Sequence, residues 1–267
     1  MSASFPLDEY LQRIGASAGG AITEARLAEL QRANLFALPF ENFDIQLGRG
    51  INLDPQHLID KLLRNQRGGY CFELNGLFLS ALRAEGFEAR PLLARVHVSG
   101  EPSGRSHQLS LVTLSGRNWI TDVGFGGACP RLPMPLEYNT EVAQDGQVFR
   151  LTEHPLGYLL QLQQVKGQWL DLYSFDLTPV VANDIVYGNH FTSTHPASFF
   201  TTARIAVRWT PEGQQRLFNF SATTVKGSDE QTDTLADDDS YLLELKARFG
   251  IELDAPYSAL QPLPPVS

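Results

Sequence analysis

Residues 67–75 read Arg67-Gly68-Gly69-Tyr70-Cys71-Phe72-Glu73-Leu74-Asn75, and they decide how the rest of the chain is interpreted. A cysteine follows a glycine pair and begins a predicted helix from Cys71 to Glu85, which Gly86 ends. The first N–H groups of a helix are unpaired and its dipole is positive there, so this position favours the reactive thiolate. Cys71 is therefore a candidate nucleophile. The alternative, a buried structural thiol, is about as common for a lone cysteine at a helix start.

Helical signals dominate the first third of the chain. Apolar spacing predicts a helix over Leu7–Ile14, and Thr23 is the expected N-cap of a second helix. Asp54-Pro55 predicts the start of a third helix, because aspartate caps well and proline suits the first helical position. Gly68-Gly69 is expected to end that helix.

Strand patterns follow in the middle and last thirds. The predicted strands are residues 87–98, 107–114, 118–123, 157–165, 168–175, 203–209 and 214–220. Ser115-Gly116-Arg117-Asn118 and Lys166-Gly167 are predicted turns between neighbouring strands. A final apolar helix is expected over residues 241–249. The acidic Asp237-Asp238-Asp239 before it suits a helix N-terminus better than a metal site.

Composition limits the class of protein. The chain has 267 residues and a formal net charge of −9, and its length predicts roughly one to three domains. The acidic balance argues against nucleic acid, whose phosphates attract clustered lysine and arginine. No run of about 18 apolar residues predicts a membrane span, and Met1–Tyr10 lacks the basic and apolar regions of a secretory signal. The two cysteines, Cys71 and Cys129, indicate a reducing, cytoplasmic location.

A cysteine nucleophile needs a base, and the base needs an orienting partner. Of six histidines, His107 opens an apolar strand, and Asp122 ends the next strand. A tight turn at Gly116-Arg117 would pair Asp122 with Leu111, several residues from His107. A longer loop, a bulge or strong coiling would be needed to bring the two together. From spacing alone His107 and Asp122 have structural alternatives, and the triad stays open.

Other motifs carry weaker signals. Gly124-Phe125-Gly126-Gly127 could approach a ligand closely, although a plain turn is the simpler interpretation and the ending of a Walker loop is absent. His190 and His195 lie five residues apart in a turn-like segment, which is poor support for zinc. We expect no metal. Cys129 has no second motif around it and is predicted to be a structural thiol.

Taken together, several motifs resemble those of the arylamine N-acetyltransferase family. The resemblance covers Tyr10 to about Phe220. The sequence Phe72-Glu73-Leu74-Asn75 resembles that of the bacterial members of the family. The similar segments are Pro39-Phe40-Glu41-Asn42-Phe43, the stretch around Cys71, Ser106-His107-Gln108-Leu109, Asp122-Val123-Gly124-Phe125-Gly126, and Asn189 to Phe200 with Ser193-Thr194-His195-Pro196.

The resemblance implies an α+β fold in three parts. These are an N-terminal helical bundle over residues 1–86, a central β-barrel over residues 87–190, and a C-terminal α/β lid over residues 191–267. The first two parts would form a catalytic core like that of papain-like and transglutaminase-like enzymes. The family fold would place histidine and aspartate beside the helix-borne cysteine.

The resemblance also implies roles for individual residues. Cys71 would be the nucleophile, His107 the base and Asp122 the orienter in ping-pong transfer of acetyl from acetyl-CoA to arylamines, arylhydrazines or arylhydroxylamines. Expected CoA contacts are Ser103, Gly104, Gly124, Phe125 and Gly126, with Arg105 as a further candidate or a solvated charge. Phe125, Phe199 and Phe200 are expected to line the acceptor site, although the latter two could equally be core.

Glu41 and Arg67 carry charge inside apolar or glycine-rich motifs, and we predict that they pair and fix the loop before Cys71.

The alternative functions are a papain-like cysteine hydrolase or amidase with the same triad, a transglutaminase-like enzyme, and a binding protein without activity.

Overall fold

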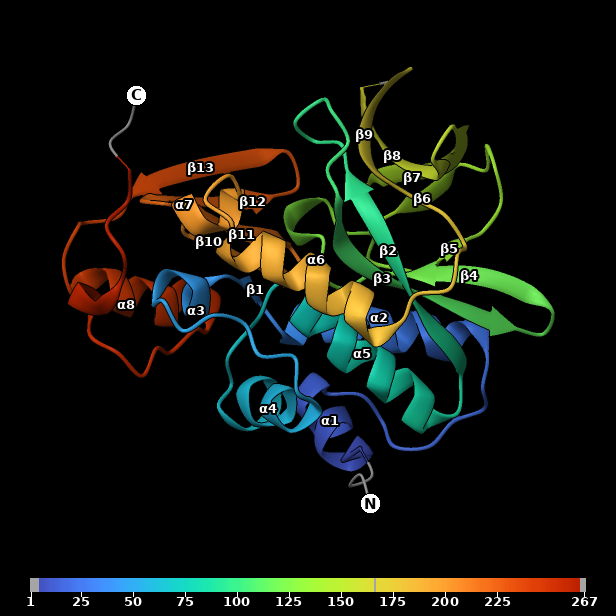
Figure 1. Ribbon diagram of the computed structural model, residues 1–267, viewed down its shortest axis with the longest axis horizontal. Coiled ribbons are helices and arrows are strands. Elements are labelled where there is room, and N and C mark those ends of the chain that lie inside the picture. The colour runs from blue at the N-terminus through green and yellow to red at the C-terminus, as the bar shows by residue number, and fades with distance from the viewer. Residues whose placement is uncertain (1–4, 166, 265–267) are drawn as a thin grey trace.

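The chain folds into N-terminal helices, an eight-stranded sheet and a five-stranded sheet, as a computed structural model describes for residues 5–165 and 167–264 (Figure 1). The first four residues of Met1–Tyr10 and Lys166 of a predicted turn lie outside the described residues. None of the described helices is long and apolar enough to cross a membrane.

Most helices begin and end close to the predicted signals, but the helix that Asp54 caps ends at Arg64, with Asn65 as its C-cap, and not at the predicted Gly68-Gly69. Thr23 Oγ1 accepts from the backbone N–H of Arg26 at 3.2 Å, and Asp54 Oδ1 accepts from that of Gln56 at 2.9 Å. Gly86, at φ +107°, ends the helix that Cys71 begins. The α-helices are α1 (Leu7–Ile14), α2 (Glu24–Ala37), α3 (Phe43–Gln46), α4 (Pro55–Ile59), α5 (Cys71–Glu85), α6 (Ala182–Thr194), α7 (Phe199–Thr202) and α8 (Ser240–Glu244). The π-helical turns η1 (Asp60–Arg64) and η3 (Leu245–Phe249) extend α4 and α8, and η2 (Gly126–Ala128) and η4 (Tyr257–Ala259) are short 3-10 turns.

The eight-stranded sheet forms a nearly closed barrel in the order β5-β4-β3-β2-β9-β8-β7-β6. Its strands are β2 (Glu88–Val96), β3 (Arg105–Leu114), β4 (Arg117–Thr121), β5 (Met134–Pro135), β6 (Val142–Gln144), β7 (Gln147–His154), β8 (Gly157–Val165) and β9 (Gln168–Phe175). Its interior is filled by leucines and aromatic rings such as Leu109, Leu160 and Phe149. The other face of β3 carries Val112 and Leu114, which pack on the α5 side.

The predicted pairing of Asp122 with Leu111 is wrong. The two-residue turn is Ser115-Gly116, and both residues have positive φ, as a type I′ hairpin requires. Ser110 therefore pairs with Thr121, so Asp122 follows opposite Leu109 as the chain leaves the sheet. His107 is the diagonal neighbour of that position on the same face, and diagonal neighbours are within side-chain reach. No bulge or long loop between β3 and β4 is needed.

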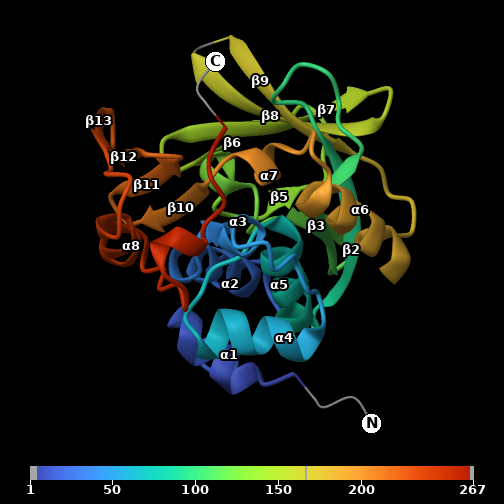
Figure 2. The same cartoon turned by 60° about the vertical axis from the view of Figure 1, so that its left-hand side comes forward.

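The five-stranded sheet joins the two ends of the sequence. Its order is β1-β10-β11-β12-β13, with strands β1 (Phe40–Glu41), β10 (Ile205–Thr210), β11 (Gly213–Phe218), β12 (Ser221–Lys226) and β13 (Asp229–Thr234). The short β1 pairs with β10 on one side, and on the other side the Glu41 N–H donates to the Gly69 carbonyl at 2.9 Å. Figure 2 shows this sheet beside the barrel, with helices α1, α4 and α5 below. The loop before Cys71 thus rests on a strand that the C-terminal sheet holds in place.

Helix α6 corrects another expectation. His190 and His195 do not lie in a turn: His190 is inside α6 and His195 caps its C-terminal end. The predicted boundary between residues 190 and 191 falls inside this helix. In Figure 1, α6 runs across the front of the molecule, and it contacts β3 and α7.

Candidate active site

Cys71, His107 and Asp122, called the Cys71 cluster below, meet where the start of α5 reaches β3. His107 Nε2 donates to Asp122 Oδ2 at 2.7 Å. Because this bond occupies Nε2, Nδ1 is the ring nitrogen left for the Cys71 thiol, which is close enough to the imidazole to help raise the pKa of His107. The thiol also contacts the Ser106 carbonyl, with an Sγ–O distance of 3.7 Å. All three residues are almost fully buried.

The electrostatics of the Cys71 cluster favour an imidazolium–carboxylate pair. Burial disfavours charge on His107, but Asp122 and Cys71 outweigh it and raise the pKa of His107 to about 10. Burial also disfavours the charged carboxylate of Asp122. His107 and hydrogen bonds from Asn75 and Gly124 outweigh this effect and lower the pKa of Asp122. Both shifts favour the charged forms of His107 and Asp122.

Asn75 joins the three structural elements that carry the Cys71 cluster. Its Nδ2 donates to Asp122 Oδ1 at 2.9 Å and to the Gln108 carbonyl at 2.7 Å. Its Oδ1 accepts from the Val123 N–H at 3.0 Å. Asn75 belongs to the motif around Cys71, but no role was predicted for it from the sequence. Its position one helical turn after Cys71, on the same face of α5, was the available signal.

Gly124 lets the Asp122 loop approach α5 closely. A Cβ atom built on Gly124 would lie 2.7 Å from Asn75 Nδ2 and 2.8 Å from the Cys71 Cα. The Gly124 N–H also donates to Asp122 Oδ1 at 2.8 Å. Glycine is therefore required at position 124 because the loop after Asp122 passes so close to α5 that no side chain would fit. This requirement is separate from any contact with a ligand.

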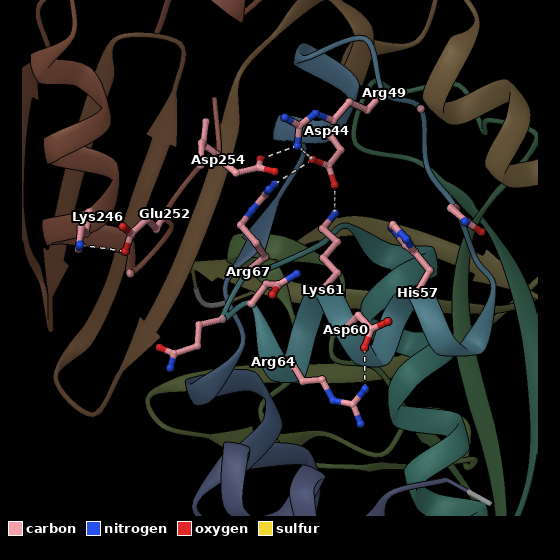
Figure 3. Close-up of a pocket in the computed structure, with 16 residues that line it drawn as sticks. Asp44, Arg49, His57, Asp60, Lys61, Arg64, Arg67, Lys246, Glu252 and Asp254 are labelled. Atoms are coloured by element: carbon pink, nitrogen blue, oxygen red, sulfur yellow. Dashed lines mark hydrogen bonds and ion pairs between the residues drawn. The ribbon is translucent and has the colours of Figure 1, made fainter. Parts of the chain in front are cut away.

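Beneath the start of α5 lies an ionic network of Glu41, Asp44, Lys61, Arg67 and Glu73. The predicted pair is confirmed, since Arg67 Nη2 lies 2.7 Å from Glu41 Oε1 with both groups buried. Asp44 contacts both cations, with Lys61 Nζ at 2.6 Å and Arg67 Nη2 at 3.2 Å. Figure 3 shows both cations extending toward Asp44. Sequence reasoning missed Asp44, Lys61 and Glu73.

This network also caps α5. Lys61 Nζ lies 2.7 Å from Glu73 Oε1, while Glu73 Oε2 accepts from the Tyr70 N–H at 3.0 Å. Burial disfavours the ammonium of Lys61, but the surrounding carboxylates outweigh it and raise the pKa of Lys61. The residue just before Cys71 is thereby held through its backbone.

The residues expected to contact CoA lie on two loops that border the Cys71 cluster. Ser103 Oγ ties its loop together by accepting from the Val96 N–H at 2.8 Å. Gly104 lines a hollow of about 290 Å³ together with Arg105, Ser106 and Tyr187. Arg105 is paired with Asp176. On the other loop, the Gly126 carbonyl accepts from Trp209 Nε1 at 3.2 Å.

The three predicted acceptor aromatics have different surroundings. Phe125 packs edge-on against His107, with ring centroids 5.0 Å apart. Phe200 packs against Tyr70, the neighbour of Cys71, at 5.7 Å. Phe199 is 55% exposed and stacks on Phe218. The structure therefore brings Phe125 to the Cys71 cluster and Phe200 to the neighbouring Tyr70, while Phe199 faces the surface.

Two more residues surround the Asp122 side of the site. Tyr173, which sequence reasoning missed, is fully buried with its ring centroid 5.1 Å from that of His107. Cys129 is fully buried, and its thiol donates to the Asp122 carbonyl at 3.2 Å. Burial and the Asp122 charge raise the pKa of Cys129, as expected for a structural thiol.

A second hollow, larger than the one beside Gly104, lies away from the Cys71 cluster. It measures about 910 Å³ and is lined by charged residues from both ends of the chain, including Arg49, Lys61, Arg67 and Asp254 (Figure 3). The charged side chains in it are mostly paired with one another, as Arg49 is with Asp254 at 2.6 Å. Within residues 5–165 and 167–264, no group of three or more His, Cys, Asp or Glu side chains is arranged to hold a metal ion.

Comparisons with known proteins identify the family to which this chain belongs. A family model described as N-acetyltransferase matches residues 24–257. A Salmonella typhimurium protein named arylamine N-acetyltransferase / N-hydroxyarylamine O-acetyltransferase is 40% identical over 223 residues, covering 81% of this chain and 78% of its own. This chain belongs to the arylamine N-acetyltransferase family.

Solved structures agree with this placement. The arylamine N-acetyltransferase from Salmonella typhimurium superposes with a TM-score of 0.89 at 35% identity, covering 96% of this chain and 94% of its own. The Mycobacterium marinum arylamine N-acetyltransferase in complex with CoA gives 0.88 at 31% identity, covering 96% and 97%. The α+β fold with a nearly closed barrel, expected from the resemblance, is confirmed.

Proposed function

We propose that this chain is an acetyl-CoA-dependent arylamine N-acetyltransferase that carries the acetyl group as a thioester on Cys71. The observation that carries the proposal is the Cys71 thiol at the start of α5 beside His107, whose other ring nitrogen is bonded to buried Asp122 at 2.7 Å. Membership of the arylamine N-acetyltransferase family supports the choice of acetyl donor and acceptor.

The first half-reaction loads the enzyme. The Cys71 sulfur, stabilised as an anion by the His107 imidazolium, attacks the thioester carbonyl of acetyl-CoA. The carbon–sulfur bond to CoA breaks, and His107 gives its proton to the leaving CoA thiolate. The Cys71 N–H, at the open end of α5, is suited to stabilise the oxyanion in between.

The second half-reaction releases the product. Arylamines are neutral at pH 7, so the nitrogen lone pair can attack the acetyl carbonyl on Cys71. The carbon–sulfur bond to Cys71 breaks, and the amine proton passes to neutral His107, which restores the ion pair. Asp122 holds the ring orientation in both steps and stabilises the imidazolium whenever His107 is protonated.

The surroundings support the assignment of binding regions. Phe125 and Phe200 would contact a flat apolar acceptor beside Cys71, since both rings already pack against the Cys71 cluster or its neighbour. We keep Phe199 as a weaker acceptor candidate at the surface. The loop of Ser103 and Gly104, with the glycines after Asp122, is proposed for CoA, which the Mycobacterium marinum relative binds.

A two-step assay tests the proposal. The protein is first incubated with acetyl-CoA alone, and mass spectrometry should find one added acetyl group on the peptide that contains Cys71. An arylamine is then added, and the adduct should disappear as the acetylated amine forms. Absence of the adduct, with cleavage of peptide or ester substrates instead, would support a papain-like hydrolase. Absence of both activities would support a binding protein.

A further inference from the structure

Asn189 of α6 connects the residue before Cys71 to a distant part of the chain. The hydroxyl of Tyr70 donates to Asn189 Oδ1, and Asn189 Nδ2 donates to the Ile51 carbonyl at 3.2 Å. The backbone carbonyl of Asn189 accepts from Ser193 Oγ at 2.7 Å, which tightens the helix around it. Asn189 is 9% exposed and Tyr70 is fully buried. Nothing in the proposed mechanism uses this contact.

Tyr70 can transmit this contact to Cys71 because the rest of its side chain is immobilised. Its ring packs against Phe72 at 5.6 Å and against Phe200 at 5.7 Å between centroids. Its backbone N–H is held by Glu73. Burial raises the pKa of the Tyr70 hydroxyl, so it stays protonated and remains a donor to Asn189. Tyr70 is therefore held at its ring, its hydroxyl and its backbone N–H, and its backbone leads directly into Cys71.

Helix α6 also touches the strand that carries His107. A Cβ atom on Gly188 would lie 2.8 Å from the Arg105 carbonyl oxygen and 2.8 Å from Phe72 Cζ. Gly188 thus allows α6 to contact both the residue two before His107 and the residue after Cys71. One helix spans the two parts of the Cys71 cluster that must stay in register.

We infer that Asn189 is a positioning residue that fixes Cys71 relative to His107 by holding the Tyr70 hydroxyl. The inference rests on the proposed acetyl transfer through Cys71, and it goes beyond it by assigning a role to a residue on a different element. Reaction geometry is sensitive to small displacements, and an error of about 1 Å can cost about a hundredfold in rate.

Four variants test the inference: Asn189→Ala, Tyr70→Phe, the double variant, and Asn183→Ala as the matched control on an exposed position of α6. Two rates are measured per folded molecule, acetylation of Cys71 in a single turnover and alkylation of Cys71 by iodoacetamide. We expect each single variant to slow both rates about tenfold or more, with the KM for the amine unchanged. The double variant should be no slower than the slower single variant, and Asn183→Ala should match the wild type.

Several outcomes would overturn the inference. Losses that multiply in the double variant would mean that Asn189 does not act through the Tyr70 hydroxyl. Unchanged alkylation in Tyr70→Phe, which removes only the hydroxyl, would do the same even if Asn189→Ala did not fold. If the wild type forms no acetyl adduct, the proposed function fails, while alkylation still decides the role of Asn189.

Discussion

Two buried sets of charged or reactive side chains flank the start of α5, and they differ in how their charges are matched. In the ionic network, the buried Lys61 and Arg67 lie between carboxylates on more than one side. In the Cys71 cluster, the imidazolium has one carboxylate and a thiol as neighbours. Burial is similar in both, so burial of charge does not by itself mark a reactive group. A site becomes chemically useful where one partner of a buried charge can be exchanged for substrate.

This comparison predicts opposite effects of mutation, and the largest is at the sulfur. Cys71→Ala should abolish the acetyl adduct and amine acetylation, because no other group in the Cys71 cluster can form the thioester. The thermal midpoint should stay close to that of the wild type. Mass spectrometry and thermal denaturation measure the two properties. Cys129→Ala is the matched control and should still form the adduct on Cys71, and an adduct in Cys71→Ala would remove Cys71 from the mechanism.

Asp122→Asn should be the next most damaging change to activity. An amide cannot stabilise the imidazolium or enforce the same ring orientation, and comparable changes in Ser-His-Asp enzymes cost about 10⁴-fold in kcat. We expect a loss of about 10³-fold or more in kcat/KM with an arylamine. Steady-state kinetics measure it. Near-normal activity would mean that the contact with His107 is structural only.

Mutations in the ionic network should lower the free energy of unfolding. Arg67→Met leaves the fully buried carboxylate of Glu41 without its cation, and breaking a buried pair costs about 3–5 kcal/mol in the free energy of unfolding. Urea denaturation measures this loss. Arg64→Met is the control, because Arg64 is half exposed and its ion pairs are screened by solvent, so its effect should be much smaller. Equal effects at the two positions would contradict a special role for the buried pair.

The comparison also predicts a pH dependence of stability. His107 has a folded-state pKa of about 10 against about 6.5 unfolded, so its protonation stabilises the folded protein fully below about pH 6.5. This contribution should be lost as the pH rises toward 10. The free-energy difference between wild type and His107→Gln should therefore shrink over that window. Denaturation at several pH values checks it, and a difference that grows with pH would contradict the ion pair.

Local signals in the sequence were enough to predict many elements. The bounds of α1, α5, β8 and β9 match because caps, prolines and turn glycines act within a few residues. Helix α6 was not recognised as the setting of His190, because its polar face and β-branched residues give little apolar periodicity. Contacts from Gly188 and Asn189 to distant segments hold it instead.

The contacts within the Cys71 cluster were harder to predict from the sequence than its individual residues. The residue types at Cys71, His107 and Asp122 were visible, but their contact depended on whether the turn used Ser115-Gly116 or Gly116-Arg117. A shift of this kind moves every cross-strand partner. Asn75 was missed as a linking residue for a related reason. Its partners lie 33 and 47 residues further along the chain, and no local pattern encodes such contacts.

The two-residue strand β1 has a consequence for when the protein becomes competent during synthesis. One side of β1 supports Gly69 of the loop before Cys71, and the other pairs with β10. Asn42, next to β1, bonds the Ile205 N–H, which lies 163 residues later. At about 5–20 residues per second, that partner emerges on the order of ten to thirty seconds after Asn42. The loop before Cys71 therefore gains its full support only after the C-terminal sheet has been synthesised and has paired with β1.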